Sequence, residues 1–555
     1  MLDCSAPPHA AARRASSPSC VGLLGSSSRR CAACIVAELC WTARLLLTPL
    51  RGVHRRRARL WAVVTRIVIL GGGPAGYEAA LVAATSHPET TQVTVIDCDG
   101  IGGAAVLDDC VPSKTFIAST GLRTELRRAP HLGFHIDFDD AKISLPQIHA
   151  RVKTLAAAQS ADITAQLLSM GVQVIAGRGE LIDSTPGLAR HRIKATAADG
   201  STSEHEADVV LVATGASPRI LPSAQPDGER ILTWRQLYDL DALPDHLIVV
   251  GSGVTGAEFV DAYTELGVPV TVVASQDHVL PYEDADAALV LEESFAERGV
   301  RLFKNARAAS VTRTGAGVLV TMTDGRTVEG SHALMTIGSV PNTSGLGLER
   351  VGIQLGRGNY LTVDRVSRTL ATGIYAAGDC TGLLPLASVA AMQGRIAMYH
   401  ALGEGVSPIR LRTVAATVFT RPEIAAVGVP QSVIDAGSVA ARTIMLPLRT
   451  NARAKMSEMR HGFVKIFCRR STGVVIGGVV VAPIASELIL PIAVAVQNRI
   501  TVNELAQTLA VYPSLSGSIT EAARRLMAHD DLDCTAAQDA AEQLALVPHH
   551  LPTSN

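Results

Sequence analysis

The chain has 555 residues, of which 47% are hydrophobic and 18% are charged. A chain of this length predicts about three domains, each large enough to bury a core. Its 50 basic and 51 acidic residues nearly cancel, which removes the electrostatic reason to expect a nucleic-acid partner. No apolar run reaches the roughly 18 residues that a membrane helix needs, so we expect no transmembrane segment.

Residues 1–62 differ in composition from everything after them. They contain ten arginines, no lysine, two acids and five of the ten cysteines of the chain. This composition is typical of an organellar transit peptide, but a compact pattern begins abruptly at Val63. We therefore favour an N-terminal extension that is disordered or absent from the mature protein. The other cysteines are scattered, so we expect a cytoplasmic protein with no disulfide framework and no metal site.

A strand, a glycine-rich turn, a helix and a second strand follow directly. The turn in TRIVILGGGPAGYEAALVAA contains Gly71, Gly73 and Gly76, and QVTVIDCD forms the next strand, which ends at Asp97. In such a unit the first glycine permits the turn, the second lets the backbone approach a pyrophosphate, and the third allows close helix packing. An acid at the end of the second strand binds ribose hydroxyls. The pattern predicts a dinucleotide site.

The same pattern recurs about 180 residues later, in DHLIVVGSGVTGAEF. Gly251, Gly253 and Gly256 repeat the fingerprint, but Ala274 stands where an acid would select NAD. Ser275 and His278 follow and can donate hydrogen bonds to a 2′-phosphate, so we expect NADPH to be accepted as well as NADH. The alternative is that His278 is an exposed loop residue without this role.

Three further motifs carry a family resemblance: ATG at 213–215, GSVPN at 338–342 and TGIYAAGD at 372–379. With the two fingerprints, they make the chain from Val63 to about Met527 similar to the flavoprotein disulfide reductases, the lipoamide dehydrogenase group above all. The resemblance implies FAD at the first fingerprint and NADPH or NADH at the second. It also implies that Asp379 holds the flavin ribitol. Further cofactor contacts are implied at Gly103, Lys114, Gly179, Thr214, Gly215, Gly338 and Ala387.

The resemblance also implies the architecture. We expect an α/β fold with two Rossmann-like nucleotide-binding domains and a C-terminal α+β dimerisation domain. The expected FAD-binding domain comprises residues 63–217 and 341–410, and the NAD(P)-binding domain comprises 218–340. Residues 411–533 would form the dimerisation domain of a homodimer, and 534–555 a tail.

The chain departs from the family at its catalytic motif. The family pattern GGTCLNxGCxPSK reads GGAAVLDDCVPSK here, so Ala105 replaces the first cysteine and Cys110 alone remains. The pattern HPTxxE reads YPSLSG, which puts Tyr512 in place of a histidine base and Gly517 in place of its glutamate. A tyrosine hydroxyl is a poor general base near neutral pH. We therefore expect no dithiol–disulfide exchange.

Lys114 and Glu258 match the ion pair that the family places beside the flavin. A paired lysine stabilises the negative charge of the reduced flavin, while the glutamate partners the lysine. The alternative is a buried ion pair that only fixes two helices.

Without the cysteine pair, the chain resembles those relatives of the disulfide reductases that lack it and reduce quinones. The resemblance implies an NAD(P)H:quinone oxidoreductase, in which Tyr512 and Ser514 of the dimer partner would contact the acceptor. Two enzymatic alternatives stay open: a peroxidase or oxidase that cycles Cys110 through a sulfenic acid, and a transhydrogenase between NADH and NADPH. A third alternative belongs to another class, a flavin-containing structural subunit of a dehydrogenase complex.

Overall fold

The computed structural model describes residues 64–134, 142–184 and 190–527. The predicted extension at 1–62 and the predicted tail at 534–555 lie outside these residues. No helix of the described part is long and apolar enough to cross a membrane.

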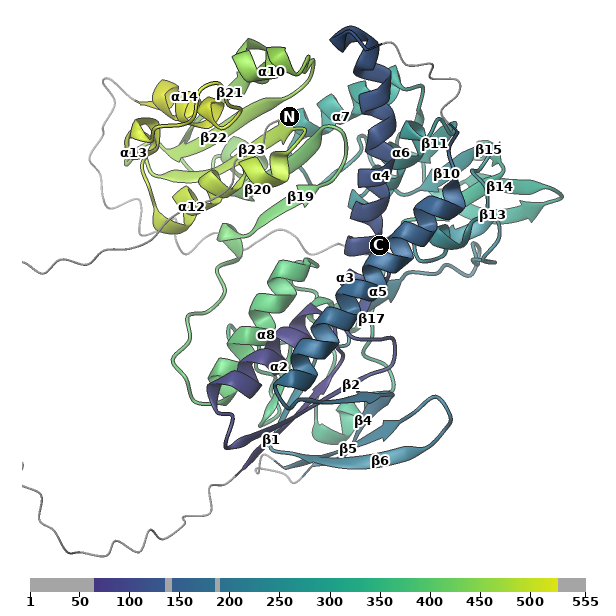
Figure 1. Cartoon of the computed structure of the whole chain (residues 1–555), viewed down its shortest axis with the longest axis vertical. Helices are drawn as coiled ribbons and strands as arrows, with labels where there is room; N and C mark the ends of the chain where they lie inside the picture. Colours follow the sequence, from purple (N-terminus) through teal and green to yellow (C-terminus); the bar gives the residue numbers. More distant parts are fainter. Residues whose placement is uncertain (1–63, 135–141, 185–189, 528–555) are drawn as a thin grey trace, which may run out of the picture. The chain divides into compact units, whose positions relative to one another are not determined.

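The first fingerprint lies in a five-stranded parallel sheet with strand order β18-β7-β1-β2-β3. Strands β7 and β18 are fully buried and β1 and β2 are buried over four residues each, because both faces of the sheet are covered, whereas the edge strand β3 has no buried residue. Helices α2, α5 and α8 cover one face, and the antiparallel sheet β4-β5-β6 covers the other (Figure 1). The elements are β1 (Thr65–Leu70), α2 (Pro74–Ser86), β2 (Thr91–Asp97), α5 (Leu145–Ser169), β3 (Gln173–Ala176), β4 (Arg178–Ser184), β5 (His191–Thr196), β6 (Thr202–Ala207), β7 (Val209–Val212), β18 (Ile374–Ala376) and α8 (Ala387–Ala401).

The second fingerprint lies in another five-stranded parallel sheet, ordered β12-β11-β10-β16-β9. Helices α6 and α7 pack with this sheet, and an antiparallel sheet β13-β14-β15 adds to its core. The elements are β9 (Ile231–Thr233), β10 (Leu247–Val250), α6 (Val254–Glu265), β11 (Val270–Val273), α7 (Ala285–Glu297), β12 (Arg301–Phe303), β13 (Ala308–Thr314), β14 (Gly317–Met322), β15 (Thr327–Gly330) and β16 (His332–Met335).

The C-terminal part is an antiparallel sheet, ordered β19-β20-β23-β22-β21. Helices α11, α12 and α14 bury their apolar residues against it. The elements are β19 (Ala415–Val418), β20 (Glu423–Gly428), α9 (Gln431–Asp435), β21 (Ala441–Pro447), α10 (Ala452–Met456), β22 (Phe463–Arg469), β23 (Val475–Ala482), α11 (Ala485–Leu488), α12 (Leu490–Asn498), α13 (Val502–Gln507) and α14 (Gly517–Leu526).

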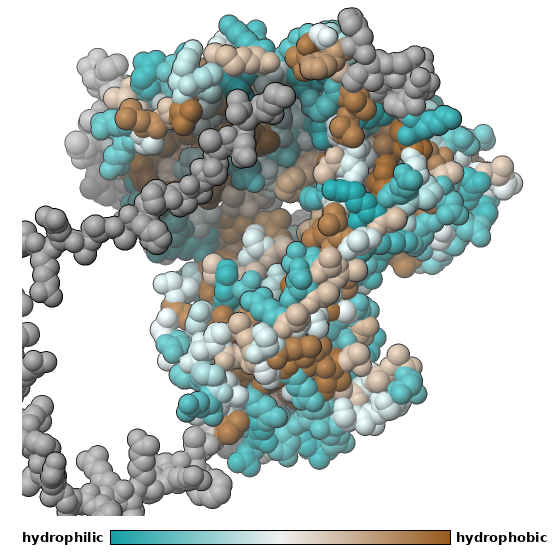
Figure 2. Space-filling model, viewed as in Figure 1, coloured by the Kyte–Doolittle hydropathy of each residue, from teal (hydrophilic) through white to brown (hydrophobic). Residues whose placement is uncertain are grey.

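Two connecting segments join the first sheet to the rest of the fold and border the candidate site. Helix α3 (Gly103–Leu107) and helix α4 (Cys110–Arg128) follow the first βαβ unit, and α4 packs against both α5 and α6. Short strands β8 (Ala216–Pro218) and β17 (Ser339–Pro341) pair antiparallel where the chain leaves and re-enters the first sheet. On the face in Figure 2, hydrophilic and hydrophobic residues are interspersed, and the hydrophobic ones occur in small groups. The predicted fold class is confirmed.

Candidate active site: a dinucleotide pocket at three helix N-termini

A pocket opens where the strands of the first sheet end. Gly71 has a φ of +106°, and a Cβ there would collide with the carbonyl oxygen of Ala213. A Cβ at Gly76 would likewise collide with the carbonyl oxygen of Gly71. At Gly73, in contrast, a Cβ would meet nothing nearer than 4.0 Å. The first and third glycines are therefore needed for packing, and the second leaves open space at the helix N-terminus.

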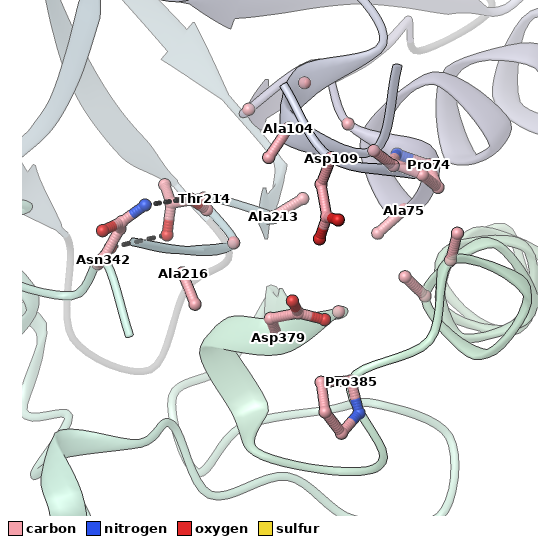
Figure 3. Close-up of a pocket in the computed structure, with 18 of the residues that line it drawn as sticks. Pro74, Ala75, Ala104, Asp109, Ala213, Thr214, Ala216, Asn342, Asp379 and Pro385 are labelled. Carbon is pink, nitrogen blue, oxygen red and sulfur yellow. Dashed lines mark hydrogen bonds between the residues drawn. The ribbon is translucent and has the colours of Figure 1, made fainter. Parts of the chain in front are cut away.

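Three long helices and the short helix α3 begin at this pocket. The first residues of α2, α4 and α8, or the residues just before them, line it (Figure 3). None of the three helices has an acid in its first turn. Backbone N–H groups and the positive ends of helix dipoles favour a negatively charged ligand at such a place. The pocket therefore fits the diphosphate of a dinucleotide.

The predicted site residues divide into those that line the pocket and those that lie elsewhere. The lining residues are Gly71, Gly73, Asp97, Gly103, Cys110, Thr214, Gly215, Asp379 and Ala387. Gly76 lies behind the pocket in α2. Gly179 lies in β4, against Leu70, and Gly338 precedes β17 with a φ of +93°. Neither of these two glycines lines the pocket.

Asp97 closes one edge of the pocket by binding backbone. Its Oδ2 accepts from the N–H of Gly72 at 2.6 Å, and its Oδ1 accepts from Asp99 and Gly100 at 2.8 and 2.5 Å. The carboxylate therefore holds the glycine turn and the turn after β2 in position. Each carboxylate oxygen has two lone pairs, which leaves acceptor capacity for a ribose hydroxyl.

Sequence reasoning did not single out Asn342, which lines the pocket and joins two chain segments there. Its side-chain Nδ2 donates to the carbonyl oxygen of Thr214 at 3.0 Å, and the Thr214 hydroxyl donates to the carbonyl oxygen of Asn342 at 2.7 Å. The Ser217 hydroxyl donates to Asn342 Oδ1 at 2.8 Å. Asn342 ends the GSVPN motif, so that motif contained the signal.

Cys110 and Ala105 both line the pocket. Burial, and next the charge of the neighbouring Asp109, raise the pKa of the Cys110 thiol to about 12. A thiol with this pKa carries almost no thiolate near neutral pH, and the thiolate is the reactive form. The structure therefore gives no support to the expected alternative in which Cys110 cycles through a sulfenic acid.

Lys114 lies one turn along α4 from Cys110 and is held from two directions. Its Nζ donates to Glu258 Oε2 on α6 at 2.8 Å and lies 5.1 Å from the centre of the Phe419 ring. Glu258 Oε1 accepts from the backbone N–H of Phe419 at 3.0 Å. Burial alone would lower the pKa of Lys114, but the charge and hydrogen bond of Glu258 outweigh it and the pKa is raised. A fixed positive charge thus stands beside the pocket.

The second fingerprint repeats the geometry of the first. A Cβ at Gly251 would collide with the carbonyl oxygen of Thr336, and one at Gly256 with that of Gly251, whereas Gly253 has open space at the start of α6. Ser275 is exposed. His278 Nδ1 lies 2.9 Å from the carbonyl oxygen of Val279, and its Nε2 lies 3.5 Å from Asp277 Oδ1.

Tyr512 does not line the pocket of its own chain. It lies between α13 and α14 and is 87% exposed. The predicted contact between Tyr512 and an acceptor therefore depends on a second copy of the chain. Among the described residues no cluster of metal-ligating side chains occurs.

Two nucleotide fingerprints, a pocket at three helix N-termini and a fixed lysine beside it define a flavin- and nicotinamide-dependent oxidoreductase. Residues 65–394 match the family model described as pyridine nucleotide-disulphide oxidoreductase, and residues 414–523 match the dimerisation domain of that family. The chain belongs to this family, which uses FAD and NAD(H).

Individual relatives of the chain are consistent with this family membership. The dihydrolipoyl dehydrogenase of Chlamydia pneumoniae is 30% identical over 81% of this chain and 94% of its own. That of Zymomonas mobilis is 30% identical over 82% of this chain and 96% of its own. The solved structure of LpdA from Mycobacterium tuberculosis is 99% identical, covers 84% of this chain and 100% of its own, and has a TM-score of 0.81. The flavoprotein disulfide reductase RclA from Escherichia coli, 22% identical with a TM-score of 0.72 over 83% of this chain and 100% of its own, shows the shared fold.

These comparisons contradict both the predicted quinone reductase and the expectation of no dithiol–disulfide exchange, because the curated relatives are dihydrolipoyl dehydrogenases. The prediction combined three absent groups, at Ala105, Tyr512 and Gly517, with a resemblance to relatives that lack the cysteine pair and reduce quinones. Missing groups in a relay do not specify an acceptor, and no quinone-binding feature supported the choice. The predictions of the family, the fold class and the cofactors are confirmed, and the prediction of a quinone acceptor is wrong.

Proposed function

We propose that this protein exchanges electrons between a nicotinamide dinucleotide and a dithiol of the dihydrolipoyl class at its FAD pocket. The observation that carries the proposal is the Lys114–Glu258 pair, which is fixed by Phe419 one helical turn from Cys110. The names of the curated relatives support the dithiol as the second partner. FAD supplies the hydride and electron chemistry when it is bound.

The residues of the chain would orient and stabilise that cofactor. The N-termini of α2 and α8 would face its diphosphate, and Asp379 would accept hydrogen bonds from its ribitol. Lys114 would stabilise the negative charge that develops on the ring system as it is reduced. Ser275 and His278 would let the second site accept NADPH as well as NADH.

The dithiol substrate would bring its own pair of sulfur atoms to the pocket. It becomes a disulfide by losing two electrons and two protons. The nicotinamide gains both electrons with one proton as a hydride, and the second proton is released to solvent. Ala105 has no sulfur and the Cys110 thiol has a raised pKa, so these two positions cannot form a disulfide with each other and the substrate would supply both sulfur atoms of the exchange. In the homodimer, Tyr512 of the second copy would then border the dithiol.

The test is anaerobic turnover of the FAD-loaded protein with dihydrolipoamide and NAD, followed as NADH formation. Lys114→Met should lower the rate by about 10²-fold or more, because an oriented charge at the reacting group is lost. The matched control is Lys153→Met, since Lys153 forms an exposed pair with Asp239 at the same 2.8 Å distance. NADH formation that equals the enzyme-free rate would overturn the proposal.

A further inference from the structure

Arg235 brings a positive charge to the wall of the FAD pocket. Of the lining residues that the structure describes, it alone has a cationic side chain, whereas Asp97, Asp99, Asp109 and Asp379 are acids. The Asp97 carboxylate is occupied by backbone N–H groups. The cofactor adds the negative charge of its diphosphate to these acids. Arg235 is therefore the lining side chain whose charge is opposite to that of the cofactor.

The second sheet supplies Arg235 to a pocket that is built at the first. Arg235 lies two residues after β9 and directly before η2 (Gln236–Asp239). The Gln236 side chain accepts hydrogen bonds from the N–H and the hydroxyl of Thr233 at 2.8 and 3.0 Å, and Trp234 is buried. The residues on both sides of Arg235 are thus held in place, which fixes the direction from which its side chain enters the pocket.

The guanidinium group of Arg235 has few contacts within the chain. Its Nε lies 3.3 Å from Asp108 Oδ2, in an ion pair that lacks hydrogen-bond geometry. Its Cζ lies 5.2 Å from the centre of the Trp234 ring. Among the residues that the structure describes, no acceptor receives a hydrogen bond from this group. Arginine carries its N–H donors in a planar fork, so these donors are available to a ligand.

The neighbours of Arg235 place it on the α4 side of the pocket. Its partner Asp108 directly precedes Asp109, the N-cap residue of α4, which is followed by Cys110. Burial raises the pKa of Asp109, and the charges of Lys114 and Arg235 both oppose this increase. The two cations therefore act on one end of the pocket, the end where Lys114 would face the flavin ring. We call it the ring end. The N-termini of α2 and α8 would face the diphosphate instead.

We propose that Arg235 is a further FAD-binding residue. Its guanidinium group donates hydrogen bonds to the cofactor at the ring end of the pocket, and its charge stabilises the reduced, anionic form more than the oxidised form. A cation at the diphosphate would stabilise both forms equally, since the charge of the diphosphate does not change. This inference rests on the part of the proposed function that assigns the pocket to FAD, and it does not involve the dithiol.

The test measures two properties of the FAD-loaded protein: the loss of FAD on dilution, followed by flavin fluorescence, and the midpoint potential, measured against a dye of known potential. Arg235→Met should weaken the binding of oxidised FAD by about three- to tenfold and that of the reduced cofactor by about tenfold more. A tenfold difference between the two forms corresponds to a midpoint potential that is lower by about 30 mV.

The matched control is Arg230→Met. Arg230 directly precedes β9, does not line the pocket, and donates to the carbonyl oxygen of Ser331. This variant should leave both the affinity and the potential unchanged. Arg235→Lys keeps the charge without the planar fork, so it should regain most of the potential that Arg235→Met loses.

A double variant separates contact with the cofactor from a role confined to Asp108. Asp108→Asn/Arg235→Met removes both members of the ion pair, so it leaves no uncompensated acid at Asp108. If Arg235 only neutralised Asp108, this variant would regain the wild-type potential, and that result would overturn the inference. We expect the potential to stay low.

Equal weakening of the two cofactor forms in Arg235→Met, or no weakening of either, would also overturn the inference. No dithiol is present in these measurements. Failure of the wild type to oxidise dihydrolipoamide would therefore overturn the proposed function and leave these results unchanged.

Discussion

Replacing Glu258 with alanine tests the ion pair that anchors the proposed site. The variant leaves Lys114 Nζ without its partner at 2.8 Å and the Phe419 N–H without its acceptor at 3.0 Å. The Glu258 side chain is 4% exposed and that of Lys114 is 30% exposed. Breaking a fully buried pair costs about 3–5 kcal/mol, and the partial exposure of Lys114 reduces this, so we expect a loss of about 2–3 kcal/mol.

The assay is denaturant unfolding of the FAD-loaded protein, combined with the rate of flavin reduction by NADH. Asp239→Ala is the control, because it removes an exposed pair of equal length and should cost less than about 1 kcal/mol. The double variant Lys114→Met/Glu258→Ala should be more stable than Glu258→Ala, since it removes the uncompensated charge. Because the pKa of Lys114 is raised, the contribution of the pair persists through neutral pH and is lost as pH rises through that raised value. A Glu258→Ala loss no larger than that of Asp239→Ala would refute this reasoning.

Three further predictions concern single positions. Gly76→Ala should weaken FAD binding more than about tenfold in a fluorescence titration, because the added Cβ collides with backbone. Gly253→Ala should keep FAD and slow only the reduction of the flavin by NADH. An equal loss of FAD in the two variants would contradict this prediction. Burial and the charge of Asp109 raise the pKa of Asp379 to about 6, so this carboxyl group holds its proton more tightly in the folded apoprotein and its contribution to stability falls as pH rises toward 6. Asp379→Asn apoprotein should therefore melt higher than wild type at pH 7, and a lower melting temperature would count against the buried charge. Cys110 should react slowly with iodoacetamide at neutral pH, and rapid labelling found by mass spectrometry would contradict its raised pKa.

Most of the fold could be predicted because its signals are local. Apolar runs such as Leu247–Val250 and Val270–Val273, each next to a glycine turn or a loop, specify buried parallel strands without knowledge of the rest of the chain. The α+β character of the C-terminal part was visible in the strands Phe463–Arg469 and Val475–Ala482. The family motifs between these segments then indicated how the parts combine.

Site residues could be predicted only at positions where the backbone geometry permits a single residue type. Gly71 and Gly76 are of this kind, since backbone atoms occupy the space of a side chain at both positions. Asp109 is not, because only the structure shows that it turns away from its helix and into the pocket. Arg235 reaches the same pocket from a distant segment, and no local pattern indicates this contact. The acceptor was predicted wrongly because it was inferred from absent groups and a resemblance, without any residue that binds a quinone.

An anaerobic titration of the FAD-loaded protein with dihydrolipoamide tests the central claim most directly. With no nicotinamide present, the account predicts that the dithiol alone bleaches the absorbance of the oxidised flavin and that added NAD restores it. A flavin that NADH reduces but dihydrolipoamide leaves oxidised would contradict the account.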